Sequence, residues 1–229
     1  MRPRIAGLLA VVCVLASGAA VLASSQFAAT LQITYSSQTP NSPSGIDGLA
    51  TWSDPGEPAG KPKEIDKIKI VFHPGTRLDT AALPYCRASD TTVQRLGLRA
   101  CPRSTRLGTV VAKGVISTGA QFDPVATLFN ARRHIIVVVR LGGRTLTNFR
   151  DDVGRRSITI NAKIPMGIAL IRFQPHVPVH VRKRDKHRRA YMRTPPTCPP
   201  SGVWTTSATF SYRDGSSQNL TTTSPCRSK

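Results

Sequence analysis

The cysteines are the residues whose spacing says most about chemistry. Cys86 and Cys101 enclose fourteen residues, whereas zinc-binding cysteines usually come as close pairs and redox dithiols lie two residues apart. This spacing predicts a structural disulfide, worth on the order of 3 kcal/mol for a loop of about fifteen residues. Four cysteines allow three pairings, but we favour Cys198 with Cys226 for the second bond, because each local pairing closes a self-contained unit.

Histidines and carboxylates give weaker signals. Prolines near His176 and His180 exclude a regular helix there, and on a strand these two residues would lie about 13 Å apart, too far for ligands of one ion. Asp151 and Asp152 precede Val153-Gly154, which favours a hairpin turn over paired-carboxylate catalysis. We therefore expect no metal site and no cofactor.

The motifs that mark common enzyme classes are missing from the sequence. There is no glycine-flanked nucleophilic serine and no serine followed three residues later by lysine. A phosphate-binding loop and a dinucleotide-binding glycine pattern are missing as well. We therefore expect a protein that is not an enzyme.

Residues 182–189 carry the strongest functional signal. Six of them are cationic and one is acidic, in a chain with a formal charge of +20. Such a surface attracts polyanions through long-range fields and counterion release. The alternative is a solvated loop, because dense like charges repel one another and favour disorder. The residues expected to bind anions are Arg182, Lys183, Arg184, Lys186, Arg188 and Arg189.

The charge also indicates the kind of partner. It favours an anionic cell-wall polymer or a membrane surface, with non-specific nucleic-acid binding expected in vitro. Stacking of single-strand bases is not supported, because Tyr191 is the one aromatic residue nearby. The sequence does not indicate a protein partner.

A short helix is expected between the first two cysteines. Ser89 and Asp90 can cap its start, Thr91 with Gln94 fits a capping box, and Gly97 can end it. A helix of about two turns is marginal alone. The disulfide would therefore make it persistent.

Most of the remaining chain has the pattern of β-strands. Apolar and polar residues alternate at 31–35, 68–72 and 158–164, and 135–139 is apolar throughout, as in a strand covered on both faces. Short strands separated by turn residues predict one all-β domain over 24–229, a β-sandwich or jelly-roll-like fold. Further strands are expected at 49–52, 109–117, 125–131, 134–141, 144–149 and 168–173.

The C-terminal residues 198–226 are expected to form a hairpin clamped by the second disulfide, after a basic loop at 182–193. Asp214-Gly215 supplies the turn. The residues that share one face of its first strand are Trp204, Thr206, Ala208, Phe210 and Tyr212.

Residues 1–23 have the organisation of a secretory signal peptide. Arg2 and Arg4 precede an apolar run that ends in small residues. The run is also long enough to span a bilayer uncut, so an N-terminal membrane anchor is the alternative. Both readings place the rest of the chain outside the cytoplasm, in the cell envelope or the extracellular space, where disulfides persist.

Several turn and cysteine motifs occur in a defined order. They are His73-Pro74-Gly75, Leu83-Pro84-Tyr85-Cys86, Gly97-Leu98-Arg99-Ala100-Cys101-Pro102 and Thr194-Pro195-Pro196-Thr197-Cys198-Pro199. In this order the chain resembles a group of exported actinobacterial β-sandwich proteins of unknown function. The resemblance covers most of the chain after residue 23 and implies a shared fold, without catalytic residues. The basic insert before Thr194 departs from the group's pattern.

Three functions remain open from the sequence. The first is an exported, non-enzymatic envelope or secreted protein that attaches electrostatically to anionic polymer through residues 182–189. The second is a structural or protein-interaction module whose charge is incidental. The third is an enzyme whose site is assembled from distant loops.

Overall fold

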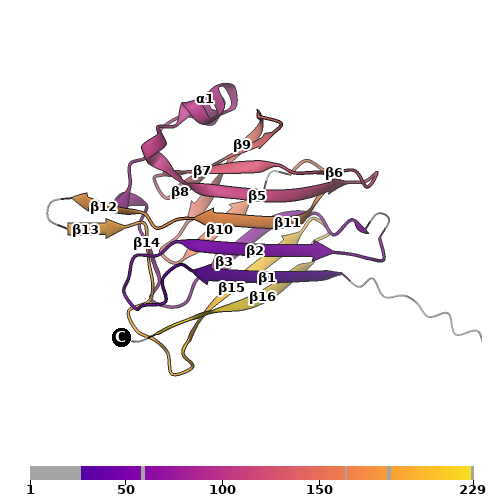
Figure 1. The fold of residues 1–229 in the computed structure, drawn as a ribbon. Helices are drawn as coiled ribbons and strands as arrows, with labels where there is room; N and C mark the ends of the chain where they lie inside the picture. Colours follow the sequence, from indigo (N-terminus) through magenta and orange to yellow (C-terminus); the bar gives the residue numbers. More distant parts are fainter. Residues whose placement is uncertain (1–26, 58–59, 163, 185–186, 228–229) are drawn as a thin grey trace, which may run out of the picture.

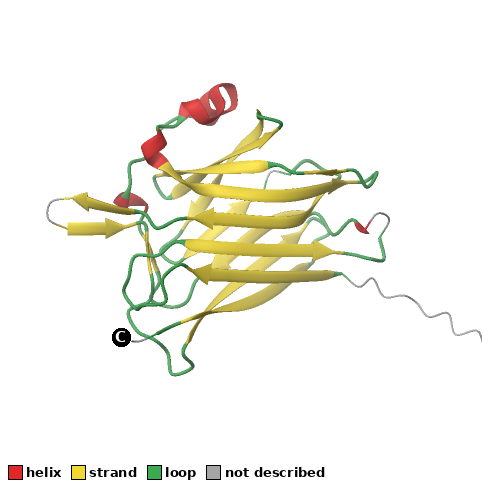
Figure 2. Ribbon diagram, in the orientation of Figure 1, coloured by secondary structure: helices red, strands yellow, loops and turns green. Residues whose placement is uncertain are grey.

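The computed structural model describes residues 27–57, 60–162, 164–184 and 187–227, so the predicted leader and Lys186 lie outside it. In this part the chain is mostly strand, with one α-helix, α1 (Asp90–Leu96), on the outside (Figure 2). Short 3₁₀ helices are η2 (Thr80–Ala82), η3 (Gly97–Ala100) and η4 (Arg103–Thr105). The strands are β1 (Ala28–Tyr35), β2 (Ile46–Ser53), β3 (Ile65–Val71), β4 (Arg77–Leu78), β5 (Arg106–Ile116), β6 (Gln121–Phe122), β7 (Val125–Ala131), β8 (His134–Leu141), β9 (Arg144–Val153), β10 (Ser157–Asn161), β11 (Ile168–Val177), β12 (Val181–Arg184), β13 (His187–Ala190), β14 (Met192–Arg193), β15 (Val203–Tyr212) and β16 (Ser217–Pro225).

One large antiparallel sheet forms the body of the protein. Its strand order is β1-β2-β11-β5-β7-β8-β9-β10-β3-β15-β16, and β6 pairs with β5 off this path. The two end strands, β1 and β16, lie side by side (Figure 1), and the buried Ser224 hydroxyl donates to the Ile33 carbonyl at 2.9 Å. The sheet therefore curls back on itself into two facing layers. This confirms the predicted all-β fold with one short disulfide-linked helix.

The hydrophobic core fills the space between the two layers. Trp52 and Phe210 meet edge to face with ring centroids 5.3 Å apart, and Tyr35 meets Trp204 at 5.4 Å. Such pairs add about 0.5–1.5 kcal/mol each beyond the burial of their area. The alternating residues of β15 from Trp204 to Tyr212 are all buried, as their pattern predicted.

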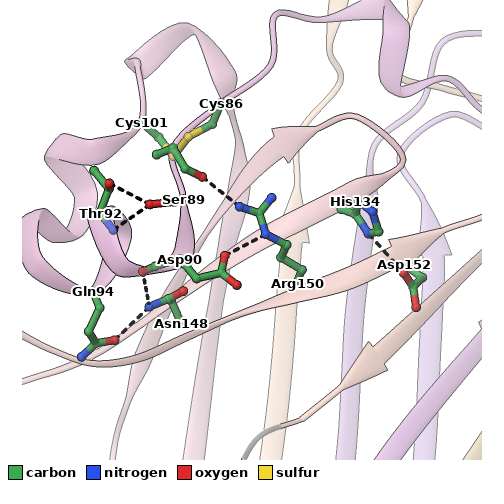
Figure 3. Close-up of polar contacts among 11 residues, drawn as sticks. Cys86, Ser89, Asp90, Thr92, Gln94, Cys101, His134, Asn148, Arg150 and Asp152 are labelled. Carbon is green, nitrogen blue, oxygen red and sulfur yellow. Dashed lines mark hydrogen bonds and ion pairs between the residues drawn. A yellow bond between two sulfur atoms is a disulfide. The ribbon is translucent and has the colours of Figure 1, made fainter.

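Helix α1 begins and ends where the sequence predicted. The Ser89 hydroxyl accepts from the Thr92 amide at 3.2 Å, and Gly97 ends the helix with φ 56°. The capping box predicted with Gln94 is wrong. The Gln94 side chain instead accepts from Asn148 Nδ2 of β9 at 2.9 Å (Figure 3).

The helix packs on the outer face of the sheet. Val93 is fully buried in a small cluster with the disulfide of Cys86 and Cys101, and this cluster includes Ile136 and Val138 of β8. Strand β8 is therefore covered on both faces, as its continuous apolar run predicted.

Both disulfides link the cysteines that the sequence favoured. Cys86 bonds to Cys101, and Cys198 bonds to Cys226 at the base of the β15–β16 hairpin. Two such bonds are typical of proteins that fold in an oxidising, extracellular-like environment. Among the described residues, no helix has the length and apolar character needed to cross a membrane.

Several predicted boundaries are wrong. Strand β10 ends at Asn161 rather than at residue 164, and β11 runs to Val177 rather than ending at residue 173. Strand β2 begins at Ile46 rather than at residue 49, because Gly48 leaves room for the Pro175 ring of neighbouring β11. Strand β9 runs to Val153, so Asp151 and Asp152 lie in a strand and not in a turn. Residues 182–193, expected to be a loop, contain strands β12, β13 and β14.

Candidate functional site

Strands β12 and β13 form a two-stranded basic ribbon that extends beyond the end of the large sheet (Figure 1). Arg182 lies directly opposite Arg189, and Lys183 lies opposite Arg188, with all four residues exposed. Like charges opposite each other destabilise a strand pair, and an isolated two-stranded hairpin is marginal in water. The ribbon therefore needs other contacts to hold its shape.

Those contacts lie at the base of the ribbon. Ala190, Tyr191 and Met192 are buried, and the Tyr191 amide donates to the His180 carbonyl at 3.0 Å. The Tyr191 carbonyl accepts from the Asp79 amide at 2.8 Å. Residues 190–192, which follow the basic residues, were thus the part of the sequence that indicated an anchored ribbon rather than a free loop.

Further arginines continue the basic surface from the base of the ribbon. Arg193 lies opposite Arg77 in the β14–β4 pair and donates to the Arg188 carbonyl at 3.2 Å. An open hollow lies next to the β14–β4 pair. Its lining includes Arg77, Arg155 and Arg156. Because side chains alternate along a strand, Arg182 with Arg189 and Lys183 with Arg188 lie on the two sides of the ribbon. We call the ribbon cations and these further arginines together the basic face. Its members are Arg77, Arg155, Arg156, Arg182, Lys183, Arg188, Arg189 and Arg193.

One described carboxylate, Asp79, lines the hollow together with the arginines, but its Oδ1 accepts from the Ala81 amide at 2.9 Å and no ion pair among the described residues joins it to the basic face. Within the described ranges, ion pairs between full charges lie elsewhere, such as Lys63 with Asp214 at 2.7 Å and Arg150 with Asp90 at 2.7 Å. Burial, together with the positive charge of Arg156, lowers the pKa of His73 beside the hollow. The surface therefore carries a positive local field.

Of the sequence-predicted anion-binding residues, the structure brings Arg182, Lys183, Arg188 and Arg189 together on the ribbon. The backbone of Arg184 pairs with His187 near the ribbon's tip. Lys186 lies outside the described residues. The sequence analysis did not predict the hollow. Its arginines come from segments about eighty residues apart, which are brought together only by folding.

The histidines are spread over the molecule. His176 Nδ1 lies 2.6 Å from Asp47 Oδ1, and His180 Nε2 lies 2.6 Å from the Leu107 carbonyl. His134 Nδ1 lies 3.1 Å from Asp152 Oδ1 on the outer face (Figure 3). The described part of the chain contains no cluster of three or more potential metal ligands.

A second site, missed by the sequence analysis, is a cavity of 380 Å³ between the two layers. Among the described residues, its lining is apolar except for Thr147 and the buried Asp151. Burial raises the pKa of Asp151 to about 7.

Strand β9 places Asp151 in this cavity. Its outward residues Asn148 and Arg150 donate to the Asp90 carbonyl and carboxylate in α1 (Figure 3). Because side chains alternate along a strand, Phe149 and Asp151 face inward. Continuing the alternation of the strand from Phe149 to Asp151 would have predicted this inward position. The sequence analysis did not continue it, because a turn was expected at Asp151.

No protein-family model and no curated protein matches this chain.

Proposed function

We propose that this is an exported, non-enzymatic protein of the cell envelope or extracellular space that attaches to a phosphate-bearing anionic polymer through its basic face. Three like-charged pairs support this role. They are Arg182 with Arg189, Lys183 with Arg188, and Arg193 with Arg77.

Binding of a polyanion would remove the repulsion within these pairs. Each pair is destabilising while its charges face each other across two strands. A phosphate group bound between them would be attracted to both charges at once. Arginine suits this task, because its planar guanidinium donates two parallel hydrogen bonds to phosphate oxygens.

The architecture suits attachment to a long polymer rather than to one small anion. The cations extend from the ribbon through Arg193 to the hollow at Arg155 and Arg156. A polymer that neutralises several of them releases several counterions, so its binding gains strength from each contact. The anchored base of the ribbon limits the conformational entropy lost on binding.

Export is supported by the two disulfides and by the leader-like residues 1–23. The disulfides are stable in an oxidising compartment, where envelope polymers are accessible. The resemblance to exported actinobacterial proteins points the same way.

The test compares retention on polyphosphate-coated beads, anionic vesicles and neutral polysaccharide beads. A ribbon variant carries R182Q, K183Q, R188Q and R189Q, and a matched control loses four exposed charges elsewhere through K67Q, K69Q, R95Q and R144Q. We expect strong retention on polyphosphate, lost in the ribbon variant and kept in the control. Equal losses in both variants would show that net charge alone is responsible, and retention on vesicles alone would favour a membrane surface.

A further inference from the structure

The interior cavity has the size and lining of a small-molecule site. Its 380 Å³ falls within the range of about 300–1,000 Å³ typical of such sites. Inward residues of β5, β7, β8, β9, β10 and β11 form its walls, among them Val110, Leu128, Val137 and Ile160. Protein interiors are normally close-packed, with few voids larger than a water molecule. A cavity of this volume is therefore unusual in a protein interior and large enough to bind a small molecule.

The cavity is elongated. A second cavity of 70 Å³ adjoins it, and both are lined by Val110, Leu128, Asp151, Ile160 and Phe173. Along β9, the distance from Thr147 to Asp151 is about 13 Å at the rise of an extended strand. A flexible chain fits this shape better than a compact ring system.

An exposed rim gives access from the surface. Leu146 and Pro165 line the cavity and are themselves exposed, and Met166 beside them is 84% exposed. Inside, Leu128 and Ile160 are buried. Apolar side chains thus continue from the surface to the interior, as an apolar ligand requires for entry.

Water is a poor occupant of this space. A buried water needs two to four polar partners, and within the described part of the lining Asp151 and Thr147 are the polar residues. Without an occupant, the lining atoms also lose dispersion contacts on one side. Hydrocarbon is the chemistry that matches these walls.

Asp151 adds one point of polar recognition. It is only 4% exposed and lines both cavities. Its Oδ1 accepts from the Asn161 amide at 3.2 Å, and the described residues provide no hydrogen bond to Oδ2. A buried carboxyl group is costly unless it is paired, so a ligand that donates a hydrogen bond would complete this site.

We propose that the cavity binds a flexible hydrocarbon chain that carries one hydroxyl or amino group, and that this group donates a hydrogen bond to Asp151. Ligands with a carboxylate are disfavoured, because it would bring a second acidic group to the buried Asp151. This site is separate from the basic face, so either assignment can fail without the other.

The experiment measures Nile red binding to the full chain and its displacement by dodecanol, dodecylamine and dodecanoate. Ala112→Phe fills the cavity from β5, while Val111→Phe adds the same ring on the outer face, where Val111 is 49% exposed. Ala126→Leu fills the same space with a smaller side chain. Circular dichroism melting curves check that each variant is folded.

We expect the two filled variants to bind Nile red about tenfold more weakly or worse, while Val111→Phe binds like the wild type. At pH 8, above the pKa of about 7 of Asp151, dodecanol and dodecylamine should displace the dye at concentrations about tenfold below that of dodecanoate, the range expected for one hydrogen bond to a charged group. Asp151→Leu should abolish this preference, and Asp151→Asn, which keeps a neutral acceptor, should retain it for dodecanol. Unchanged dye binding in both folded, filled variants would overturn the cavity assignment, and an unchanged preference in Asp151→Leu would overturn the role of Asp151.

Discussion

Arg193 lies directly opposite Arg77 in the β4–β14 pair, and its guanidinium donates to the Arg188 carbonyl of the ribbon at 3.2 Å. This one side chain connects the ribbon to the hollow formed by Arg77, Arg155 and Arg156. Two clusters of cations that are distant in sequence are thereby brought next to each other.

His73 is a natural probe of the field at the hollow. The burial of its ring and the charge of Arg156 lower its pKa. Arg156→Gln should therefore raise the pKa of His73, and polyphosphate bound at the hollow should raise it in the wild type. Both shifts can be measured by NMR titration of the ring, with Arg95→Gln as a control that leaves the pKa unchanged. A pKa that does not respond to saturating polyphosphate would place the polymer away from the hollow.

The stability of the fold should fall as the buried Asp151 ionises. Its pKa is raised from 3.8 to about 7, mainly by burial and also by the charge of Asp152. The folded state therefore holds this proton more tightly than the unfolded chain, and its contribution is fully present below about pH 4 and lost as the pH rises through about 7. This loss amounts to on the order of 4 kcal/mol in the free energy of unfolding.

Urea unfolding at pH 4, 5, 6, 7 and 8 tests this dependence. Asp151→Asn should be less sensitive to pH than the wild type and more stable above pH 7, while Asp152→Asn, at the exposed neighbouring position, should keep most of the wild-type slope. Parallel curves for the wild type and Asp151→Asn would show that Asp151 is already ionised in the folded protein.

The Cys86–Cys101 bond should hold helix α1 on the sheet. Replacing both cysteines by alanine removes a cross-link over 15 residues and should cost about 3 kcal/mol in the free energy of unfolding. Hydrogen exchange should show faster exchange of the α1 amides, because Val93 loses part of its buried cluster. Removal of Cys198 and Cys226 should cost a similar amount but leave α1 protected. Equal protection of α1 in both variants would mean that Arg150 and Asn148 are sufficient to hold it.

The contact between β1 and β16 should depend on Ser224. Its hydroxyl is the side-chain partner of the Ile33 carbonyl, and Ser224 is 1% exposed. Ser224→Ala leaves that carbonyl unsatisfied and should lower the free energy of unfolding by about 1–3 kcal/mol. Thr223→Ala, at the exposed neighbouring position, should change it by less than about 0.5 kcal/mol. Equal effects of the two substitutions would show that the Ser224 hydrogen bond does not hold the edges. They are also joined by packing and by the Thr222 hydroxyl, which accepts from the Ile33 amide at 3.4 Å.

Local patterns predicted most strands, the helix and both disulfides. The alternation at Ile68 and Ile70, and the cap at Ser89, are properties of a few neighbouring residues, so the sequence displays them directly. The order of the strands was not predictable in the same way. The contact that brings the sheet edges together joins Ile33 to Ser224, 191 positions apart, and no local signal records it.

The candidate sites were only partly predictable, for two physical reasons. Charge repulsion favoured a loop at Arg182 and Arg189, but burial of Tyr191 and its hydrogen bonds anchor these residues in a ribbon. The cavity depends on how far the two layers stand apart, which follows from the curvature of the whole sheet. The inward position of Asp151 also required β9 to extend beyond the predicted residue 149.

The salt dependence of polyphosphate binding tests the central claim most directly. The affinity of the wild type, of the ribbon variant and of the matched control should be measured over a salt series. We predict a steep linear decrease of log affinity with log salt concentration for the wild type and the control. The slope of the ribbon variant should be smaller by about three, as expected for the loss of four phosphate contacts. A salt-insensitive wild type, or the same slope for the ribbon variant and the control, would contradict attachment through the basic face.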